Sequence, residues 1–418
     1  MASSLVKPRV DIDLDGETER TMPLSASQIA VGEVLTALGL RAELRSFGGD
    51  PTAWECRLLR VDDTLTGTGF GKGASDSARV GSIFEALEYY AFSRFALNDV
   101  ALCSPTLLLK SALASDAAIH LLARLPRVPM AVRTYTSFLD NSTSPGPLFL
   151  HSPWYVEDSA APIRACLGDN YNYLPLVRHS STNGVAVGLA FEEAAVHALN
   201  EVIERDALSL FLIRSVIRPT PARVLTRDSL PTTLQELLRS IEDRLRSEVT
   251  LVNITTDLGV PSVLAVTTPS SQGVPRYGAG ASLSMFHAAT RACTELLQVA
   301  LLRERPGSVA EFHVKLNALS EYPLLQRCAR LGPHLLRRVT PEPFTDTVPP
   351  STPGGHLARI IDTLADNGYD PHLAIAEGMP AGIYACHALI PGLEHFMLVL
   401  AGHPLAPGDR GLAASKLP

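Results

Sequence analysis

Glutamate residues recur at helical spacing in three separate segments of this 418-residue sequence. Residues three, four or seven apart share one face of an α-helix, so each segment predicts a helix with a polar stripe beside an apolar one. The stripes are Ser82, Glu85 and Glu88; Glu193, Glu201, Glu204 and Arg205; and Arg291, Glu295 and Gln298. Carboxylates grouped in this way repel one another unless a cation neutralises them.

The residue types in these stripes suit a nucleotide with its metal ion. Mg²⁺ prefers oxygen ligands and is usually held by a few carboxylates together with substrate phosphates. The planar guanidinium groups of Arg205 and Arg291 match phosphate oxygens in shape and charge. One interpretation is therefore a nucleotide–Mg²⁺ site built by three helices. The alternative for any single stripe is a solvated helix face.

Three predicted helices must position the stripes, and each follows a segment rich in Gly and Ser. The helices are expected over residues 77–97, 197–211 (with Glu193 one turn earlier) and 285–305. The preceding segments, 66–76, 179–194 and 276–284, are predicted to be turns whose N–H groups approach an anion. The first of them is not a Walker A motif, because Gly73 follows Lys72 where Ser or Thr should stand. We expect Ser75 or Asp76 to cap the following helix.

The remaining pattern mixes strand-like and helical stretches and predicts an α/β (α+β) protein with helices packed on mixed or antiparallel sheets. A further helix is expected over residues 25–40. Strands are expected over residues 42–47, 54–61, 248–255, 261–268, 382–390 and 395–402.

Charge and cysteine usage exclude several classes of protein. The net charge is −7, and Lys and Arg form no run, so the sequence does not indicate a nucleic-acid-binding protein. The six cysteines lie far apart without a CxxC pair, which argues against a zinc site or a disulfide framework and fits a reducing compartment. No secretory signal and no apolar stretch of membrane-spanning length is found. We therefore expect a cytoplasmic protein that does not bind membranes.

Four motif-bearing segments, taken in order, resemble the YcaO family. GKGASDSARVGSIFEALEYY resembles the first motif of that family, and SSTNGVAVGLAFEEAAVHALNEVIERDAL resembles the second. GAGASLSMFHAATRACTELLQ resembles the third motif, and LIPGLEHF resembles a late Pro-Gly-Leu-Glu signature. Because the resemblance covers roughly Thr66 to the C-terminus, it implies a YcaO-type ATP-binding domain over residues 66–418. An N-terminal α/β lead-in over residues 1–65 would precede it.

The resemblance implies a domain that binds ATP and Mg²⁺ and phosphorylates a backbone amide oxygen of a ribosomally made precursor peptide. Cyclodehydration at Cys, Ser or Thr would give an azoline, external sulfide would give a thioamide, and an N-terminal amine would give a macroamidine. The implied metal ligands are Glu85, Glu88, Glu193, Glu201, Glu204 and Glu295. The implied nucleotide contacts are Lys72, Ser82, Arg205, Arg291 and Gln298, and the carboxylate of Pro418 is the implied catalytic group.

The sequence departs from the family pattern in three places. Tyr89 stands where the first motif usually has arginine, and Leu189 stands where the family often has asparagine. The ending HPLAPGDRGLAASKLP lacks the PxPxP common among azoline formers. A non-catalytic accessory subunit with an eroded site is therefore an alternative.

The expected partners follow from the same resemblance. The stretch before Thr66 is short for a leader-binding domain. We therefore expect a separate leader-peptide-binding protein, joined or replaced by a sulfur-delivery partner when the product is a thioamide. Homodimer formation through apolar helices is compatible with the sequence.

Overall fold

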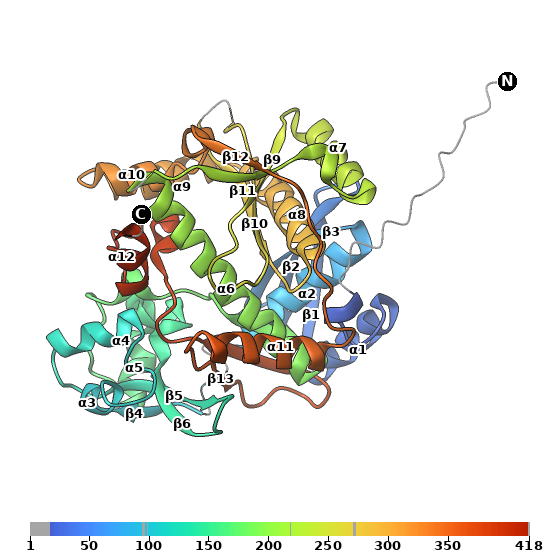
Figure 1. The fold of residues 1–418 in the computed structure, drawn as a ribbon. Coiled ribbons are helices and arrows are strands. Elements are labelled where there is room, and N and C mark those ends of the chain that lie inside the picture. The colour runs from blue at the N-terminus through green and yellow to red at the C-terminus, as the bar shows by residue number, and fades with distance from the viewer. Residues whose placement is uncertain (1–16, 94–96, 98, 218, 271–272, 417–418) are drawn as a thin grey trace.

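The structure is a computed structural model that describes residues 17–93, 97, 99–217, 219–270 and 273–416. These residues form three β-sheets with helices between and around them (Figure 1). The predicted α/β class, with helices packed on mixed and antiparallel sheets, is confirmed. Across these described ranges, no helix combines the length and the apolar character needed to cross a membrane.

The N-terminal sheet is antiparallel, in the order β1-β2-β3. Its strands are β1 (Leu40–Ser46), β2 (Thr52–Arg60) and β3 (Leu65–Gly73). The helices α1 (Leu24–Ala37) and α2 (Ser75–Ala91) bury their apolar faces together with this sheet. Because β3 pairs with β2, the lead-in and the region after residue 65 share one sheet.

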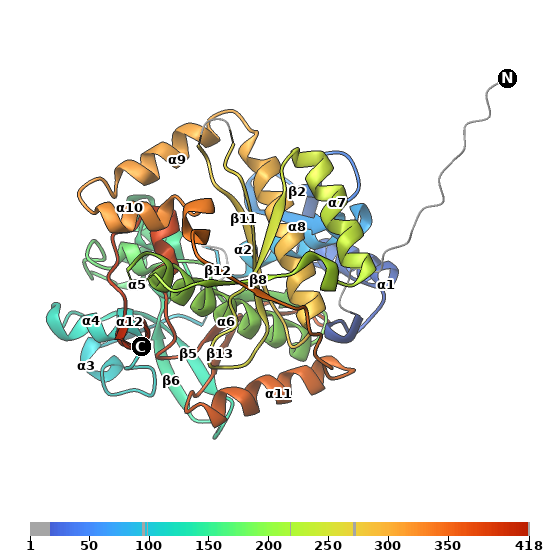
Figure 2. The same cartoon turned by 45° about the horizontal axis from the view of Figure 1, so that its top comes forward.

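The second sheet has five strands in the order β11-β10-β9-β8-β12, and only β8 and β12 pair in parallel. Its strands are β8 (Ala222–Leu225), β9 (Val249–Asn253), β10 (Ser262–Thr267), β11 (Arg276–Ala281) and β12 (Val339–Glu342). Side chains alternate along β10, so each face of the sheet is buried. Val263 packs with α7 (Thr232–Leu245) and α8 (Met285–Arg303), and Leu264 packs with α6 (Phe191–Val216) and α9 (Ser308–Asn317). Figure 2 shows these four helices around the strands β8, β11 and β12 of the sheet.

The third sheet has the order β4-β5-β13-β14-β7, with β6 paired to β5. Its strands are β4 (Ala101–Cys103), β5 (Met130–Ser137), β6 (Thr143–Pro147), β7 (Val185–Gly188), β13 (His372–Ile375) and β14 (Tyr384–Leu389). The long helix α6 contributes to the cores on both the second and the third sheet, so it lies between them in the middle of the molecule (Figure 1). The remaining helices are α3 (Pro105–Leu108), α4 (Ala117–Leu121), α5 (Ala161–Leu167), α10 (Pro323–Ala329), α11 (Pro353–Asp366) and α12 (Asp409–Lys416).

Each stripe-bearing helix follows a strand at the edge of a sheet: β3 precedes α2, β7 precedes α6, and β11 precedes α8. Glycines let two of these helices lie directly on their strands. A Cβ added at Gly69 would stand 2.2 Å from the backbone nitrogen of Ala86 on α2, and one added at Gly278 would stand 2.2 Å from that of Leu296 on α8. The glycines therefore permit a close approach of backbones, which no larger residue allows.

Three sequence-based expectations about local structure are wrong. Two of the Gly-rich segments, 66–76 and 276–284, are mainly strands rather than turns, because their glycines alternate on one strand face toward a helix. The segment 179–194 contains a turn, the short strand β7 and the start of α6. Neither Ser75 nor Asp76 caps α2; its N-cap is Ala74, and the Asp50 carboxylate accepts a hydrogen bond from the Ser75 nitrogen at 3.0 Å. Residues 396–401 form a 3₁₀ helix packed into the core beside α6, not a strand. The other expected helices and strands are present at the predicted places.

Candidate functional site

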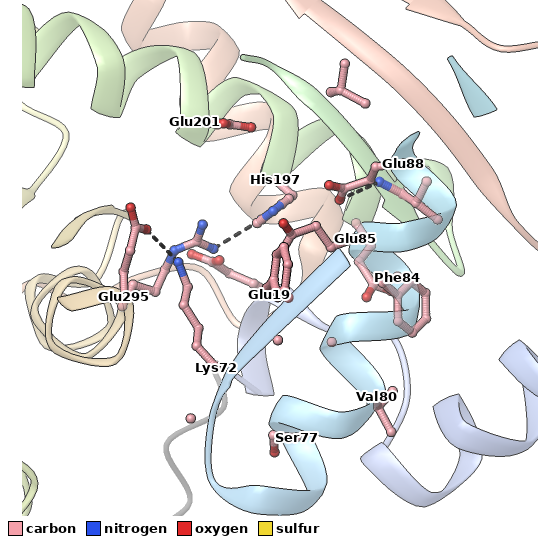
Figure 3. Close-up of a pocket in the computed structure, with 18 of the residues that line it drawn as sticks. Glu19, Lys72, Ser77, Val80, Phe84, Glu85, Glu88, His197, Glu201 and Glu295 are labelled. Carbon is pink, nitrogen blue, oxygen red and sulfur yellow. Dashed lines mark hydrogen bonds and ion pairs between the residues drawn. The ribbon is translucent and has the colours of Figure 1, made fainter. Parts of the chain in front are cut away.

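The helices α2, α6 and α8 border a cavity of about 1220 Å³. The sequence-predicted residues that line it are Lys72, Glu85, Glu88, Glu193, Glu201, Glu204, Arg205, Arg291, Glu295 and Gln298. Figure 3 shows Glu85 and Glu88 on α2, Glu201 on α6 and Glu295 beside Lys72 around this one space. The three polar stripes therefore face a common cavity rather than bulk water.

Two other predicted site residues are not part of this lining. Ser82 is fully buried, and its hydroxyl donates to the backbone oxygen of Arg79 at 2.7 Å, within α2. A Cβ added at Gly71 would stand 2.5 Å from the backbone nitrogen of Ser82, so this part of α2 lies against β3. Pro418, the predicted catalytic residue, lies outside the described residues.

On the α6 and α8 side of the cavity, the carboxylates have cationic partners. Arg205 Nη1 lies 2.8 Å from Glu204 Oε1, and its Nη2 lies 3.1 Å from Glu201 Oε1. Lys72 Nζ, from β3, lies 2.6 Å from Glu295 Oε2. Burial alone would raise the pKa of Glu295, but Lys72 and Arg205 hold it below its ordinary value. Burial alone would lower the pKa of Arg205, and the adjoining carboxylates raise it, so the guanidinium stays charged.

On the α2 side, the carboxylates have no such partner. Neither Glu85 nor Glu88 forms an ion pair with a Lys or Arg in the described part of the chain. Burial, reinforced by the charges of Glu201 and Glu295, raises the pKa of Glu85 to about 7. Burial and the charge of Glu85 raise the pKa of Glu88 well above its ordinary value. Burial is the main cause of both shifts, and no cation forms an ion pair with either carboxylate in the described ranges to reverse it.

Several buried polar atoms around the cavity have no hydrogen-bond partner among the described residues. They are Nε of Arg205, Nε of Arg291 and Oγ1 of Thr290. An unpartnered buried polar group costs about 1–3 kcal/mol, so such atoms near a cavity indicate a missing ligand. Phosphate oxygens would supply acceptors for the two arginines.

The donor set of the cavity also fits a divalent cation. Its lining contains eight carboxylates and four Lys or Arg side chains, so negative charge is in excess. No three His, Cys, Asp or Glu side chains in the described ranges are grouped closely enough to hold a metal by themselves. Mg²⁺ does not require such a group, because it usually takes one or two carboxylates and completes its shell with phosphates and water.

Sequence reasoning missed the N-terminal segment that forms one wall of the cavity. Arg20 Nη1 lies 3.1 Å from Glu193 Oε1, and the Thr21 hydroxyl donates to Glu193 Oε2 at 2.8 Å. Glu19 accepts a hydrogen bond from Ser282, and its other oxygen lies 3.5 Å from His287 Nε2. Burial alone would raise the pKa of Glu19, but His287 and Arg291 hold it below the ordinary value. No periodic spacing marks these residues, so they could not be predicted from the sequence.

His197, on the polar stripe of α6, is a hydrogen-bonding neighbour of Arg291. Arg291 Nη1 lies 3.1 Å from His197 Nδ1, and because a guanidinium only donates, this nitrogen accepts. Burial and the Arg291 charge lower the pKa of His197 well below its ordinary value, so the ring is neutral. Of the two departures from the motifs, Tyr89 lines the cavity, and Leu189 is buried in the core of α1 and α2.

Two curated relatives are similar to about half of this chain. An uncharacterized protein of Methanothermobacter thermautotrophicus is 29% identical over 227 residues, which cover 52% of this chain and 56% of that protein. An uncharacterized protein in the tfuA 3′ region of Rhizobium leguminosarum bv. trifolii is 28% identical over 226 residues, which cover 51% of this chain and 52% of that protein. The matches thus span about half the length of each relative.

Solved structures share the fold over most of the chain. YcaO from Methanopyrus kandleri, bound with AMPPCP and Mg²⁺, superposes with a TM-score of 0.65 at 18% identity, over 94% of this chain and 97% of that one. A chain of the Escherichia coli microcin synthetase McbBCD complex with pro-MccB17 bound superposes with a TM-score of 0.59 at 11% identity, over 84% of this chain and 88% of that one.

A family model described as YcaO cyclodehydratase, ATP- and Mg²⁺-binding, matches residues 70–394. The match covers most of the chain and contains every sequence-predicted residue that lines the cavity. The chain therefore belongs to the YcaO family, and ATP and Mg²⁺ are the cofactors of that family.

Proposed function

We propose that this YcaO-family protein uses ATP and Mg²⁺ to activate backbone amides of a ribosomally made precursor peptide, with azoline-forming cyclodehydration at Cys, Ser or Thr as the reaction. The observation that carries the proposal is the single cavity in which carboxylates of α2, α6 and α8 face Arg205 and Arg291. Phosphoryl transfer depends mainly on positioning and on neutralising charge, and this lining is suited to both.

Within the proposal, each side of the cavity has its own task. Bound Mg²⁺ would neutralise the phosphates, and Glu85 and Glu88 would hold it, because their charges lack a cationic partner. Arg205 and Arg291 would donate to phosphate oxygens through their unpartnered Nε atoms. Lys72, whose Nζ lies 2.6 Å from Glu295 Oε2, would lie beside the nucleotide.

The nucleophile decides which product follows from the same activation. A side chain of the peptide gives an azoline, whereas external sulfide gives a thioamide and an amine gives a macroamidine. A separate leader-peptide-binding protein is proposed as a partner, as the E. coli relative is part of a complex with a bound peptide. Because one relative is named for its place in the tfuA 3′ region, the tfuA product is the first further partner to test, including as a sulfur-delivery protein.

A non-catalytic accessory role is the competing proposal, and it rests on Tyr89 and Leu189. The cavity nevertheless contains the carboxylates and arginines that the proposal needs. Phosphate oxygens would supply acceptors for the unpartnered arginine nitrogens, and a cation would lower the raised pKa values of Glu85 and Glu88. The accessory role requires no ATP consumption, so the two proposals differ in a directly measurable way.

The test combines the purified protein with ATP–Mg²⁺, the precursor peptide encoded beside its gene and the co-encoded partners, followed by mass spectrometry of the peptide. Loss of one water per modified residue, with ADP and phosphate formed in equal amount, supports cyclodehydration. Replacement of one oxygen by sulfur supports thioamide formation instead. An unmodified peptide with intact ATP overturns the proposed activity, and Glu204→Gln serves as the control that should abolish modification.

A further inference from the structure

The cavity continues past the carboxylates of α2. Its lining runs from Ser77 on α2 to Phe92, the residue that follows this helix, a distance of about 22 Å at 1.5 Å per residue. Glu85 and Glu88 lie in the middle of that length, and Phe92 lies one turn beyond Glu88. With about 1220 Å³, the cavity exceeds the usual range of about 300–1,000 Å³ for a small-ligand pocket, which leaves room for more than a nucleotide.

The far end of the cavity is built on the last turn of α2. Trp154 Nε1 donates to the backbone oxygen of Phe92 at 2.9 Å, and the Ser152 hydroxyl donates to the same oxygen at 3.3 Å. The His151 ring packs edge-on against the Phe92 ring, with centroids 5.0 Å apart. Phe92, His151 and Trp154 all line the cavity, so this wall is aromatic and held in place by hydrogen bonds.

One nitrogen of His151 is left without a partner. Its Nδ1 lies 3.0 Å from the Ser152 hydroxyl, and because that hydroxyl gives its hydrogen to Phe92, Nδ1 donates to it. Nε2 therefore carries a lone pair, and it has no hydrogen-bond partner in the described part of the chain. The side chain is 1% exposed, so bulk water does not satisfy this acceptor either. An unmade bond of this kind destabilises the protein alone and calls for a function.

Two other histidines have their nitrogens engaged differently; His197 lines the cavity, whereas His387 is not part of its lining. His387 stacks on His151 with centroids 4.8 Å apart, donates from Nε2 to the Asn183 oxygen at 3.0 Å and accepts at Nδ1 from the Tyr135 hydroxyl at 2.6 Å. His197 accepts from Arg291. Among these three histidines, His151 is the one whose free lone pair belongs to the cavity wall beyond Glu88.

We propose that His151 is the general base of the reaction and that the peptide amide binds at this aromatic end of the cavity. The inference rests on the proposed function. The nucleophile's proton moves to His151 Nε2 as its sulfur or oxygen bonds to the amide carbon. The carbonyl π electrons pass to the oxygen, which takes the γ-phosphoryl group from ATP and releases ADP. The imidazolium returns its proton to the departing phosphate as the nitrogen lone pair forms the C=N bond. Nε2 then takes the proton that the nitrogen loses and releases it to water.

The surroundings of His151 keep it unprotonated at neutral pH. Burial, followed by the effects of His387 and Arg133, lowers its pKa well below the ordinary value. The charge of Arg133 is itself balanced by Asp99 at 3.1 Å, and the other titratable groups that act on His387 are Tyr135, His395 and Asp116. The ring is thus ready to accept a proton, as a general base must be.

The test is a single-turnover measurement of peptide modification, using the full chain with its co-encoded partners, precursor peptide and ATP–Mg²⁺. General-base catalysis contributes about 10²–10⁴-fold, so His151→Gln should slow modification by about 100-fold or more while ATP–Mg²⁺ affinity is unchanged. Added imidazole should partly restore the rate of His151→Ala. In the wild type the rate should stay level as pH falls through the ordinary histidine range, because the pKa of His151 lies below it.

His387→Gln is the matched control, because it disturbs the packing beside His151 but removes no free lone pair. Its rate of modification should fall much less than that of His151→Gln, and imidazole should not restore it. If the wild type modifies the peptide and His151→Gln modifies it equally fast, the assignment of His151 as the general base is overturned, whereas the proposed function is not. A wild-type protein that leaves the peptide unmodified overturns the proposed function itself, so the two failures are distinguishable.

Discussion

The two sides of the cavity carry the same type of side chain but differ in the ion pairs that these side chains form. On α6 and α8, Glu204 lies 2.8 Å from Arg205, and Glu295 lies 2.6 Å from Lys72. On α2, Glu85 has no cationic partner among the described residues, and burial raises its pKa to about 7. Opposite charge lowers the pKa of Glu295 despite its burial. At Glu295 the neighbouring cations outweigh burial, whereas burial still raises the pKa of Glu204 although Arg205 lies beside it.

The two sides of the cavity therefore contribute to the site in different ways. The α6 and α8 pairs are complete in the protein alone and contribute to folding. The α2 carboxylates are costly in the protein alone and are relieved only when a cation enters. Substitutions on the two sides should therefore change the stability of the nucleotide-free protein in opposite directions, although both should weaken ATP–Mg²⁺ binding.

The largest effect is expected on the paired side. Arg205→Met leaves Glu201 and Glu204 without their shared cation, and breaking a buried pair in this way costs about 3–5 kcal/mol. Urea unfolding of the nucleotide-free protein should show that loss. Arg205→Lys keeps the positive charge but not the planar guanidinium with its two terminal nitrogens. Its free energy of unfolding should therefore fall less than that of Arg205→Met. A Met variant as stable as the wild type would show that the pair does not stabilise the fold.

On the unpaired side, stability should depend on pH through Glu85. Its pKa is about 7 in the folded protein against 4.5 ordinarily, so the folded state binds more protons than the unfolded state between these values. The free energy of unfolding should therefore fall as pH rises from about 4.5 to about 7, by up to about 3 kcal/mol at 1.36 kcal/mol per pKa unit.

The measurement is urea unfolding across this pH range without metal, and the comparison is Glu85→Gln. The contribution of Glu85 is the difference between the two proteins in how steeply the free energy of unfolding falls with pH. Mg²⁺ with ATP should flatten the wild-type slope as well, because a bound cation favours the charged carboxylate. Equal slopes in both proteins would contradict the unpaired state of Glu85.

A third prediction compares the two sides in one experiment. Glu88→Gln removes an uncompensated charge and should raise the melting temperature of the nucleotide-free protein, whereas Glu204→Gln weakens the Arg205 pair and should lower it. ATP–Mg²⁺ at 100-fold over its dissociation constant should add about 2.7 kcal/mol to the wild type. That gain should vanish in both variants. If both substitutions shifted the melting temperature of the nucleotide-free protein in the same direction, the two sides of the cavity would not differ in this way.

The sequence was sufficient for the parts of the site that lie on long helices. Carboxylates three or four residues apart, as at Glu85 and Glu88, can only share a helix face, so their common direction follows from the chain alone. Charge pairing across the cavity could not be predicted in the same way. Lys72 and Glu295 are far apart in the chain, and only the packing of α8 on the first sheet brings them together.

The missed and mistaken parts have identifiable causes. Glu19 and His151 lie in segments without periodic spacing, where tertiary packing alone decides which side chains reach the cavity. The segment 66–76 was interpreted as a turn because glycine is typical of turns. Its glycines serve instead to bring a strand and a helix into backbone contact, a role that composition does not distinguish from flexibility.

The last prediction concerns what the two sides share, which is a glycine strand beneath each helix. Gly69→Ala would place a Cβ 2.2 Å from the Ala86 nitrogen, and Gly278→Ala would place one 2.2 Å from the Leu296 nitrogen. Backbone cannot rotate away as a side chain can, so each variant should lose about 1–3 kcal/mol of unfolding free energy in urea. Gly81→Ala is the matched control, because its nearest neighbour is 3.8 Å away and alanine favours a helix by about 1 kcal/mol. If Gly69→Ala were as stable as Gly81→Ala, the close approach of β3 and α2 would not be what positions Glu85.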